Sequence, residues 1–127
     1  MKFIEPRIHG FVDYFVGILL IAGPATIYDF ENAIEVFVPA LFGVIQITYS
    51  LFTRYEFGFF PTISMRKHLR FDMISGALLA ASPWIFRFAD YIWQPYVLLG
   101  GLQIVVALFT KTYSQKKHHR HHGLRVR

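Results

Sequence analysis

The sequence predicts an all-α membrane protein, a bundle of four transmembrane helices made of two tandem, parallel helical-hairpin repeats. Three observations predict it: a duplicated pattern, four apolar stretches of spanning length, and a one-sided distribution of basic residues. The chain has 127 residues, of which 54% are hydrophobic, and it contains 14 phenylalanines. A soluble domain of this size buries too little surface to hide so many apolar side chains. Lipid is therefore the expected solvent.

The duplication consists of two pairs of matching segments. Residues 7–24 align with residues 66–83 at an offset of 59, and eight of the 18 positions are identical. Residues 41–53 align with residues 98–110 at an offset of 57, and seven of the 13 positions are identical. A fixed internal period is typical of a duplicated supersecondary unit. We expect one membrane domain over residues 1–113, with repeats at about 7–54 and 66–111, followed by a tail over 114–127.

Each repeat contains two apolar segments of about 20 residues, the length that crosses the hydrocarbon core of a bilayer. Backbone groups in lipid must be paired within the segment, so these segments should be helices. Basic residues mark the cytoplasmic side of short loops, and 12 of the 13 fall in or beside the N-terminal stretch, the middle loop and the tail. Both termini are therefore predicted to be cytoplasmic. The four predicted spans are Ile8–Ile27, Ile34–Thr53, Leu69–Phe88 and Tyr91–Thr110.

A distinctive tripeptide stands near the outer end of the third predicted helix. Ser82, Pro83 and Trp84 follow the segment 72–81, which reads DMISGALLAA. With these residues the chain resembles the SPW-repeat family of small membrane proteins, which have two membrane helices in each repeat. The resemblance implies a multi-pass protein of a bacterial cytoplasmic (inner) membrane and brings no established activity. Pro83 lacks a backbone donor, so we expect it to end or kink its helix at the interface.

Two polar pairs occupy equivalent positions in the repeats. His9 and Asp13 are four residues apart, as are His68 and Asp72, so each pair lies on one helix face near the cytoplasmic end. In a structural interpretation the carboxylate orients the imidazole and complements the helix N-terminus. In a functional interpretation the pairs meet as a proton-relay mouth, a small-ion site or axial haem ligands. We expect the structural role, and no metal or cofactor, because nothing else in the sequence completes such a site.

Small and amide side chains are also repeated. Gly17 and Gly76 lack side chains and are predicted to bring the first and third helices into close contact. Gln46 and Gln103 lie near the middle of the second and fourth helices, where a buried amide needs a partner. A contact between the two glutamines is expected to stabilise the bundle.

The predicted function is a non-enzymatic structural or interaction role in the membrane. No nucleophile–histidine–carboxylate arrangement, phosphate loop or carboxylate dyad is visible in the sequence, so no catalytic residue is assigned. The alternative is a small transporter or channel that uses the His/Asp mouth. Expected contacts are the lipid bilayer and either a second copy or another membrane protein. Nucleic acid is not expected, because the topology rule explains the net charge of +5. The basic tail is expected to be solvated, and its four histidines are His118, His119, His121 and His122.

The charge distribution makes a topological prediction. Reporter fusions placed after Thr110 and within the segment Asp29–Asn32 should report opposite sides of the membrane, with Thr110 cytoplasmic. Paired alkaline phosphatase and fluorescent-protein fusions at both positions measure this. Phosphatase activity from the fusion after Thr110 would contradict the predicted orientation.

Overall fold

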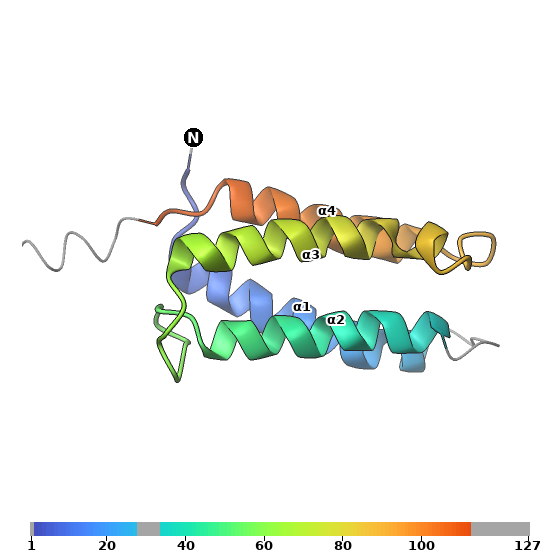
Figure 1. Ribbon diagram of the computed structural model, residues 1–127, viewed down its shortest axis with the longest axis horizontal. Helices are drawn as coiled ribbons and strands as arrows, with labels where there is room; N and C mark the ends of the chain where they lie inside the picture. The colour runs from blue at the N-terminus through green and yellow to red at the C-terminus, as the bar shows by residue number, and fades with distance from the viewer. Residues whose placement is uncertain (1, 28–33, 113–127) are drawn as a thin grey trace, which may run out of the picture.

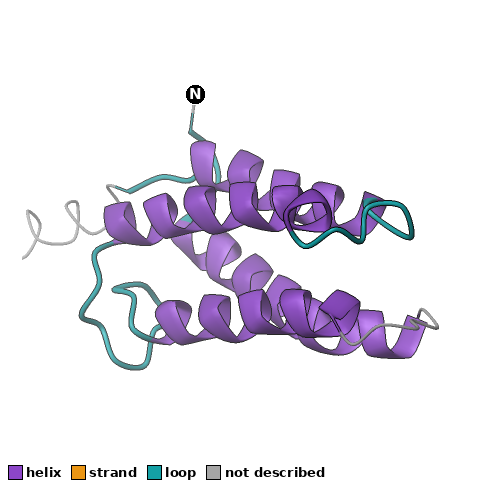
Figure 2. Cartoon of the chain, turned by 45° about the vertical axis from the view of Figure 1, so that its right-hand side comes forward, coloured by secondary structure: helices purple, strands orange, loops and turns teal. Residues whose placement is uncertain are grey.

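The computed structural model describes residues 2–27 and 34–112, and these form four helices (Figure 1). The described residues contain no β-strand, only two isolated β-bridges, and Figure 2 shows helices joined by loops. The predicted fold class, an all-α protein with four helices, is confirmed. The helices are α1 (Pro6–Ile27), α2 (Ile34–Leu51), α3 (Met65–Ile85) and α4 (Gln94–Leu108).

Local sequence explains where three of the helices begin. α1 starts at Pro6 and α4 carries a proline in its first turn, where a missing N–H costs nothing because helix-start donors have no partner in the helix. α3 begins after Ser64, whose hydroxyl oxygen accepts a hydrogen bond from the Lys67 N–H at 3.3 Å. Such a cap satisfies one of the free donors of the first turn.

The tripeptide lies in the last turns of α3. The helix continues through Pro83 and ends at Ile85, so the proline precedes the turn without ending the helix itself. The Pro83 carbonyl accepts from the N–H groups of Phe88 and Ala89, at 2.8 and 2.9 Å, and Arg87 between them has a φ of 62°. These contacts reverse the chain toward α4.

The helices pack as two pairs, α1 with α2 and α3 with α4, and the pairs meet mainly between α2 and α3. Both pairs approach closely at glycines. A methyl group added to Gly43 would lie 2.5 Å from the Gly17 carbonyl oxygen. One added to Gly76 would lie 2.7 Å from the Gly100 carbonyl oxygen. These backbones touch because no side chain separates them.

The predicted seam between the first and third helices is therefore wrong. Gly17 faces α2 and Gly76 faces α4, so each glycine packs inside its own helix pair. The residues that Gly17 and Gly76 contact are also repeated in the sequence, since Gly43 and Gly100 are matching residues of the second duplicated segment. The glycines tighten each pair and leave α1 and α3 free to present other residues to each other.

The connecting segments on one side of the bundle are tied together. The N-terminal residues, the loop from α2 to α3 and the end of α4 all lie at the same end (Figure 1). Phe3 and Ile4 donate their N–H groups to the Phe109 carbonyl at 3.0 and 2.9 Å, and Lys111 donates to the Ile4 carbonyl at 2.8 Å. The start of the chain is thus fixed against the end of α4.

The bundle carries apolar side chains outside, while its interior combines an apolar core around Val16, Leu20 and Leu79 with buried polar side chains. Buried polar residues include Gln46, Ser50, Thr53, Gln103 and Thr110. A contiguous apolar exterior of this kind suits a lipid environment and not water. Exposed large apolar residues occur on every helix and include Ile8, Phe11, Phe15, Ile18, Phe37, Leu41, Val44, Ile45, Phe71, Ile74, Leu78, Leu98, Leu102, Val105 and Leu108.

Two of the described helices are long and apolar enough to span a membrane, over Pro6–Thr26 and Ile34–Leu51. α4 is also apolar but has 15 residues. α3 has 21 residues, and its charged residues stand in its first eight positions. Membrane association is therefore carried most directly by the first helix pair.

Two neighbouring glycines in α4 test the close packing. Gly100 lies against the Gly76 carbonyl and Ala80, whereas Gly101 has no atom within 4 Å of an added methyl group. Gly100→Ala should cost about 1–3 kcal/mol because the added carbon forces the backbones apart. Gly101→Ala should gain up to about 1 kcal/mol from helix propensity. Thermal unfolding in detergent, followed by circular dichroism, compares them, and equal stability of the two variants would contradict the contact.

Candidate functional site: a buried histidine–aspartate cluster

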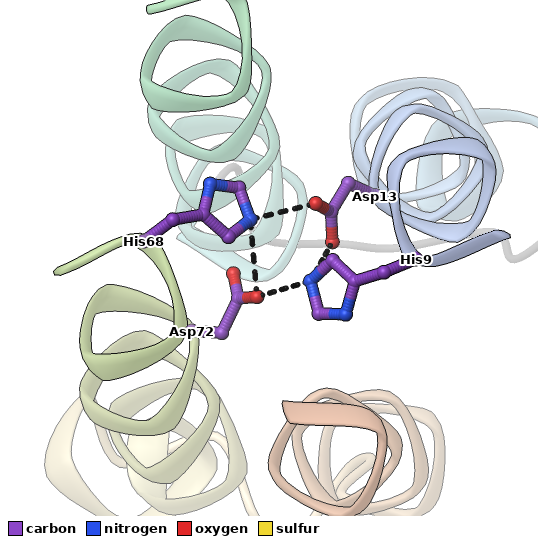
Figure 3. A group of neighbouring side chains, drawn as sticks. All are labelled: His9, Asp13, His68 and Asp72. Atoms are coloured by element: carbon purple, nitrogen blue, oxygen red, sulfur yellow. Dashed lines mark hydrogen bonds and ion pairs between the residues drawn. The ribbon is translucent and has the colours of Figure 1, made fainter. Parts of the chain in front are cut away.

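Two histidines and two aspartates meet between α1 and α3 (Figure 3). The shortest contacts run between the helices: His9 Nε2 lies 2.7 Å from Asp72 Oδ2, and His68 Nε2 lies 2.7 Å from Asp13 Oδ2. The contacts within each helix are longer, at 3.1 Å for His9–Asp13 and 3.2 Å for His68–Asp72. All four residues are at most 3% exposed. Each Nε2 therefore faces both carboxylates.

Two threonines fix the other ring nitrogen of each histidine. His9 Nδ1 lies 2.8 Å from Thr110 Oγ1, and His68 Nδ1 lies 2.7 Å from Thr53 Oγ1. The hydroxyl of Thr110 donates to the Val106 carbonyl and that of Thr53 donates to the Tyr49 carbonyl. A hydroxyl has one proton to donate. Both threonine oxygens must then accept, so each Nδ1 carries a hydrogen and donates it.

This assignment defines the charge at the centre of the cluster. With both Nδ1 atoms protonated, each Nε2 either donates to a carboxylate or accepts from one. A 2.7 Å contact is typical of a charge-assisted hydrogen bond. Each of the two short contacts therefore shares one proton. Two carboxylates and two shared protons make the cluster neutral overall, which is the arrangement that a buried site of low dielectric tolerates best.

The threonines were missed in the sequence, although a signal was present. Thr53 and Thr110 end the identical Leu-Phe-Thr runs of the two matching segments. Each also lies in one of the isolated β-bridges, Ile4 with Thr110 and Thr53 with Ile63. The duplicated threonine is thus held by main-chain pairing and reaches the histidine of the other repeat. Only the long-range contacts reveal this role, since 101 residues separate His9 from Thr110.

Two tyrosines donate hydrogen bonds to the carboxylates. Tyr49 donates to Asp72 Oδ1 at 2.5 Å, and Tyr55 donates to Asp13 Oδ2 at 3.3 Å. Tyr55 lies in the loop after α2, where burial and the neighbouring Asp13 raise the pKa of its phenol, which keeps its proton available for donation. The two tyrosines are not repeat partners, because Val106 occupies the position equivalent to Tyr49. The cluster is therefore symmetric in its histidines, aspartates and threonines and asymmetric in its tyrosines.

The predicted glutamine contact extends the polar interior beyond the cluster. Gln103 Nε2 donates to Gln46 Oε1 at 2.8 Å, and Gln46 Nε2 donates to the Asp13 carbonyl at 3.2 Å. Gln103 also lies 3.5 Å from the Ser75 hydroxyl, which in turn reaches the Asp72 carbonyl. The structure thus brings Gln46 and Gln103 together and links them to the helix turns that carry the aspartates.

One expectation about the aspartates is corrected by their position. They were expected to complement the N-termini of their own helices, yet neither α1 nor α3 has an acidic residue in its first turn. Asp13 and Asp72 are each the eighth residue of their helix. The dipole effect fades within the first turn. Their partners are the imidazoles of the opposite helix, so the carboxylates join two helices and do not stabilise the start of one.

The remaining predicted site residues lie elsewhere. Ser82 and Pro83 are buried at the far end of α3, and the Ser82 hydroxyl donates to the Leu79 carbonyl at 2.7 Å. Trp84 is 55% exposed, and its ring centroid is 6.1 Å from that of Trp93. This is the amphipathic pair expected at an interface. The tail over 114–127, with its four histidines, lies outside the described residues.

Fold and site together define the class of protein: an all-helical, membrane-associated bundle with an apolar exterior and a neutral His/Asp cluster inside. Comparison with family models identifies the family to which the chain belongs. The model of the SPW repeat domain matches residues 7–110, and the chain belongs to that family. No curated protein and no solved structure matches the chain. The family assignment therefore carries no activity with it, and the cluster remains the best indication of function.

Replacing a threonine tests the hydrogen-bond scheme. Thr110→Val keeps the side-chain shape but leaves the buried Nδ1–H of His9 without an acceptor, which should cost about 1–3 kcal/mol. Thr48→Val is a matched control, because the exposed Thr48 makes the same kind of backbone bond, to the Val44 carbonyl at 2.7 Å, and touches no histidine. Thermal unfolding in detergent should show a lowered midpoint for Thr110→Val alone. Equal midpoints would refute the assigned role of the threonine.

Proposed function

We propose that this chain is a non-enzymatic structural protein of the bacterial cytoplasmic membrane, in which the His/Asp cluster clamps two helix pairs together. The observation that carries the proposal is the crossed connection: His9 of α1 binds Asp72 of α3, and His68 of α3 binds Asp13 of α1. Each short contact joins one helix pair to the other. Apolar packing alone gives little preference for one helix arrangement in lipid, because lipid tails are as apolar as leucine.

The energetics favour a structural role. Two buried carboxylates and two buried imidazoles are costly to take out of water unless every polar atom has a partner. In this cluster threonines satisfy both Nδ1 atoms and tyrosines reach both carboxylates. Breaking one contact would leave a buried group without compensation, at about 3–5 kcal/mol. A cluster of this kind specifies a single register between α1 and α3.

The proposed topology has four crossings with both termini in the cytoplasm. The N-terminal residues, the α2–α3 loop and the end of α4 lie at one end of the bundle, and basic residues are concentrated there. In α3 the exposed residues beyond Asp72 are apolar, including Ile74 and Leu78, which supports contact with lipid. The same apolar exterior supports association with a second copy or another membrane protein as the interaction role.

A transporter or channel is the second candidate, and one observation favours it. A groove of about 480 Å³ runs between α2 and α3, and its lining includes Tyr49 and Ser75. Tyr49 donates to Asp72, so the groove reaches the cluster through one hydroxyl. Ionisable groups within membrane helices commonly mark ion or proton pathways. The remaining groove lining is mostly apolar, which favours lipid or a helix as its occupant over an ion.

Removing one carboxylate separates the two candidates. Asp13→Asn and Asp72→Asn should each lower stability by about 3–5 kcal/mol, because an imidazole loses its ionic partner in a buried site. Asp90→Asn is the matched control, since Asp90 is exposed in the turn before α4. Thermal unfolding of metal-free protein in detergent measures the change, and proteoliposomes prepared with matched amounts of folded protein measure proton and ion flux.

The clamp predicts destabilised variants and a wild-type flux no greater than that of empty liposomes. Variants that keep the wild-type midpoint but abolish a wild-type flux would replace the clamp with the transporter. Variants with the stability of Asp90→Asn and no flux in any sample would reject both roles for the cluster.

A further inference from the structure

The cluster has the composition of a metal site as well as that of a clamp. One ligand atom from each of His9, Asp13, His68 and Asp72 can be chosen so that all four lie within 4.8 Å of one another. Two imidazole nitrogens and two carboxylate oxygens form a ligand set used for divalent first-row transition metals. We propose that the cluster binds one such ion, with Zn²⁺ as the best-fitting probe, in the place of the two shared protons. This inference rests on the clamp role of the same four residues.

The distances around the cluster fit a tetrahedral ion. Metal–ligand bonds of about 2.0–2.1 Å place the ligand atoms of a tetrahedron about 3.3 Å apart. The four histidine–aspartate contacts are 2.7, 2.7, 3.1 and 3.2 Å. These contacts use both oxygens of Asp13, Oδ1 toward His9 and Oδ2 toward His68, so binding through one of them requires the Asp13 side chain to rotate. The four ligand atoms lie within 4.8 Å of one another, and a tetrahedral ion would bring each pair to about 3.3 Å.

The charge also fits. Two carboxylates balance a divalent cation, so the loaded cluster is neutral, as it is with two shared protons. Imidazoles bind metals through an unprotonated nitrogen. The threonine contacts keep the hydrogen on Nδ1 in both rings, which directs both Nε2 lone pairs at the centre once the shared protons leave. The geometry therefore selects the tautomer that a metal requires.

The hydrogen bonds around the cluster also fit a metal site. Metal-binding histidines donate their second N–H to a fixed acceptor, which orients the ring. Thr53 and Thr110 are such acceptors, and each is itself held by a bond to a backbone carbonyl. Tyr49 donates to the carboxylate oxygen of Asp72 that faces neither histidine. The outer partners that satisfy the buried clamp are therefore placed as the outer partners of a metal site would be.

The way into the site is through loops. Thr110 is paired with the N-terminal residue Ile4, and Thr53 is paired with Ile63 of the loop between α2 and α3. Two such short bridges are weaker than a helix pair and open locally before the bundle does. Loading should therefore proceed through local opening of these bridges, without unfolding of the helices.

The tail histidines must be replaced in this experiment, because their imidazoles are also metal ligands. The chain has six histidines, of which four lie in the tail. In a full-length background with those four replaced by glutamine, His9 and His68 are the only imidazoles left. The protein is purified in detergent through a tag that contains no histidine, stripped with a chelator, and equilibrated with Zn²⁺, Co²⁺ or Mg²⁺.

We expect elemental analysis after dialysis to find one Zn²⁺ per chain. Zn²⁺ should raise the midpoint of thermal unfolding, and Mg²⁺ should leave that midpoint unchanged. Co²⁺ should give the intense visible absorption of a tetrahedral site. Thr110→Val in the same background should weaken Zn²⁺ affinity by about 10–100-fold, the usual effect of losing an outer partner. Thr48→Val should leave affinity unchanged.

Two results would overturn the metal site. Folded protein with the silenced tail that retains no Zn²⁺ at equilibrium excludes it, and so does Zn²⁺ retained equally when Asp13→Asn and Asp72→Asn are combined. The clamp is tested separately, by the stability of metal-free protein. If the silenced-tail protein binds no Zn²⁺ while metal-free Asp72→Asn is destabilised, the ion is rejected and the clamp is kept. If the silenced-tail protein binds Zn²⁺ and metal-free Asp72→Asn is not destabilised, the clamp is rejected and the ion is kept.

Discussion

The crossed His–Asp contacts between α1 and α3 are the interaction on which the rest of the interior depends. Each histidine has three fixed directions: one carboxylate of the opposite helix, one carboxylate of its own helix, and a threonine behind the ring. The Gln46 side chain then donates to the Asp13 carbonyl, and Gln103 donates to Gln46. Such hydrogen bonds fix the register of the helices in a bundle with an apolar exterior, because apolar contacts alone discriminate weakly between helix arrangements in lipid.

Duplication explains how so small a chain builds this centre. One unit that carries a histidine, an aspartate four residues later and a threonine at the end of its second helix cannot satisfy its own polar atoms. Two copies do so by exchange, since the threonine at 110 reaches His9 and the threonine at 53 reaches His68. The glycines meanwhile hold the helices of each pair in backbone contact. Close backbone packing thus occurs within each helix pair, and the polar contacts join one pair to the other.

Much of this fold could be predicted from the sequence, because helix length and the repeat depend on local pattern. The four helices and the meeting of Gln46 with Gln103 follow from apolar stretches and equivalent positions. The partners of Gly17 and Gly76 did not follow, because a small residue shows where a helix approaches closely but not which helix does so. The threonines were missed for a related reason: a hydroxyl at the end of a helix usually bonds its own backbone, and its second role needs a residue far away in the chain.

The asymmetry within the cluster shows what duplication leaves unfixed. The histidines, aspartates and threonines are matched between the repeats, while the tyrosines are supplied from unrelated places, Tyr49 from α2 and Tyr55 from the following loop. Matched residues make the neutral core of four ionisable groups; unmatched residues make the two aspartates chemically different. Asp72 has one oxygen bound to a tyrosine and the other shared by both histidines, whereas Asp13 presents one oxygen to each histidine. The two aspartates are therefore inequivalent: Asp72 holds both histidines on one oxygen, whereas Asp13 uses both oxygens, of which Oδ2 also accepts from Tyr55 at 3.3 Å.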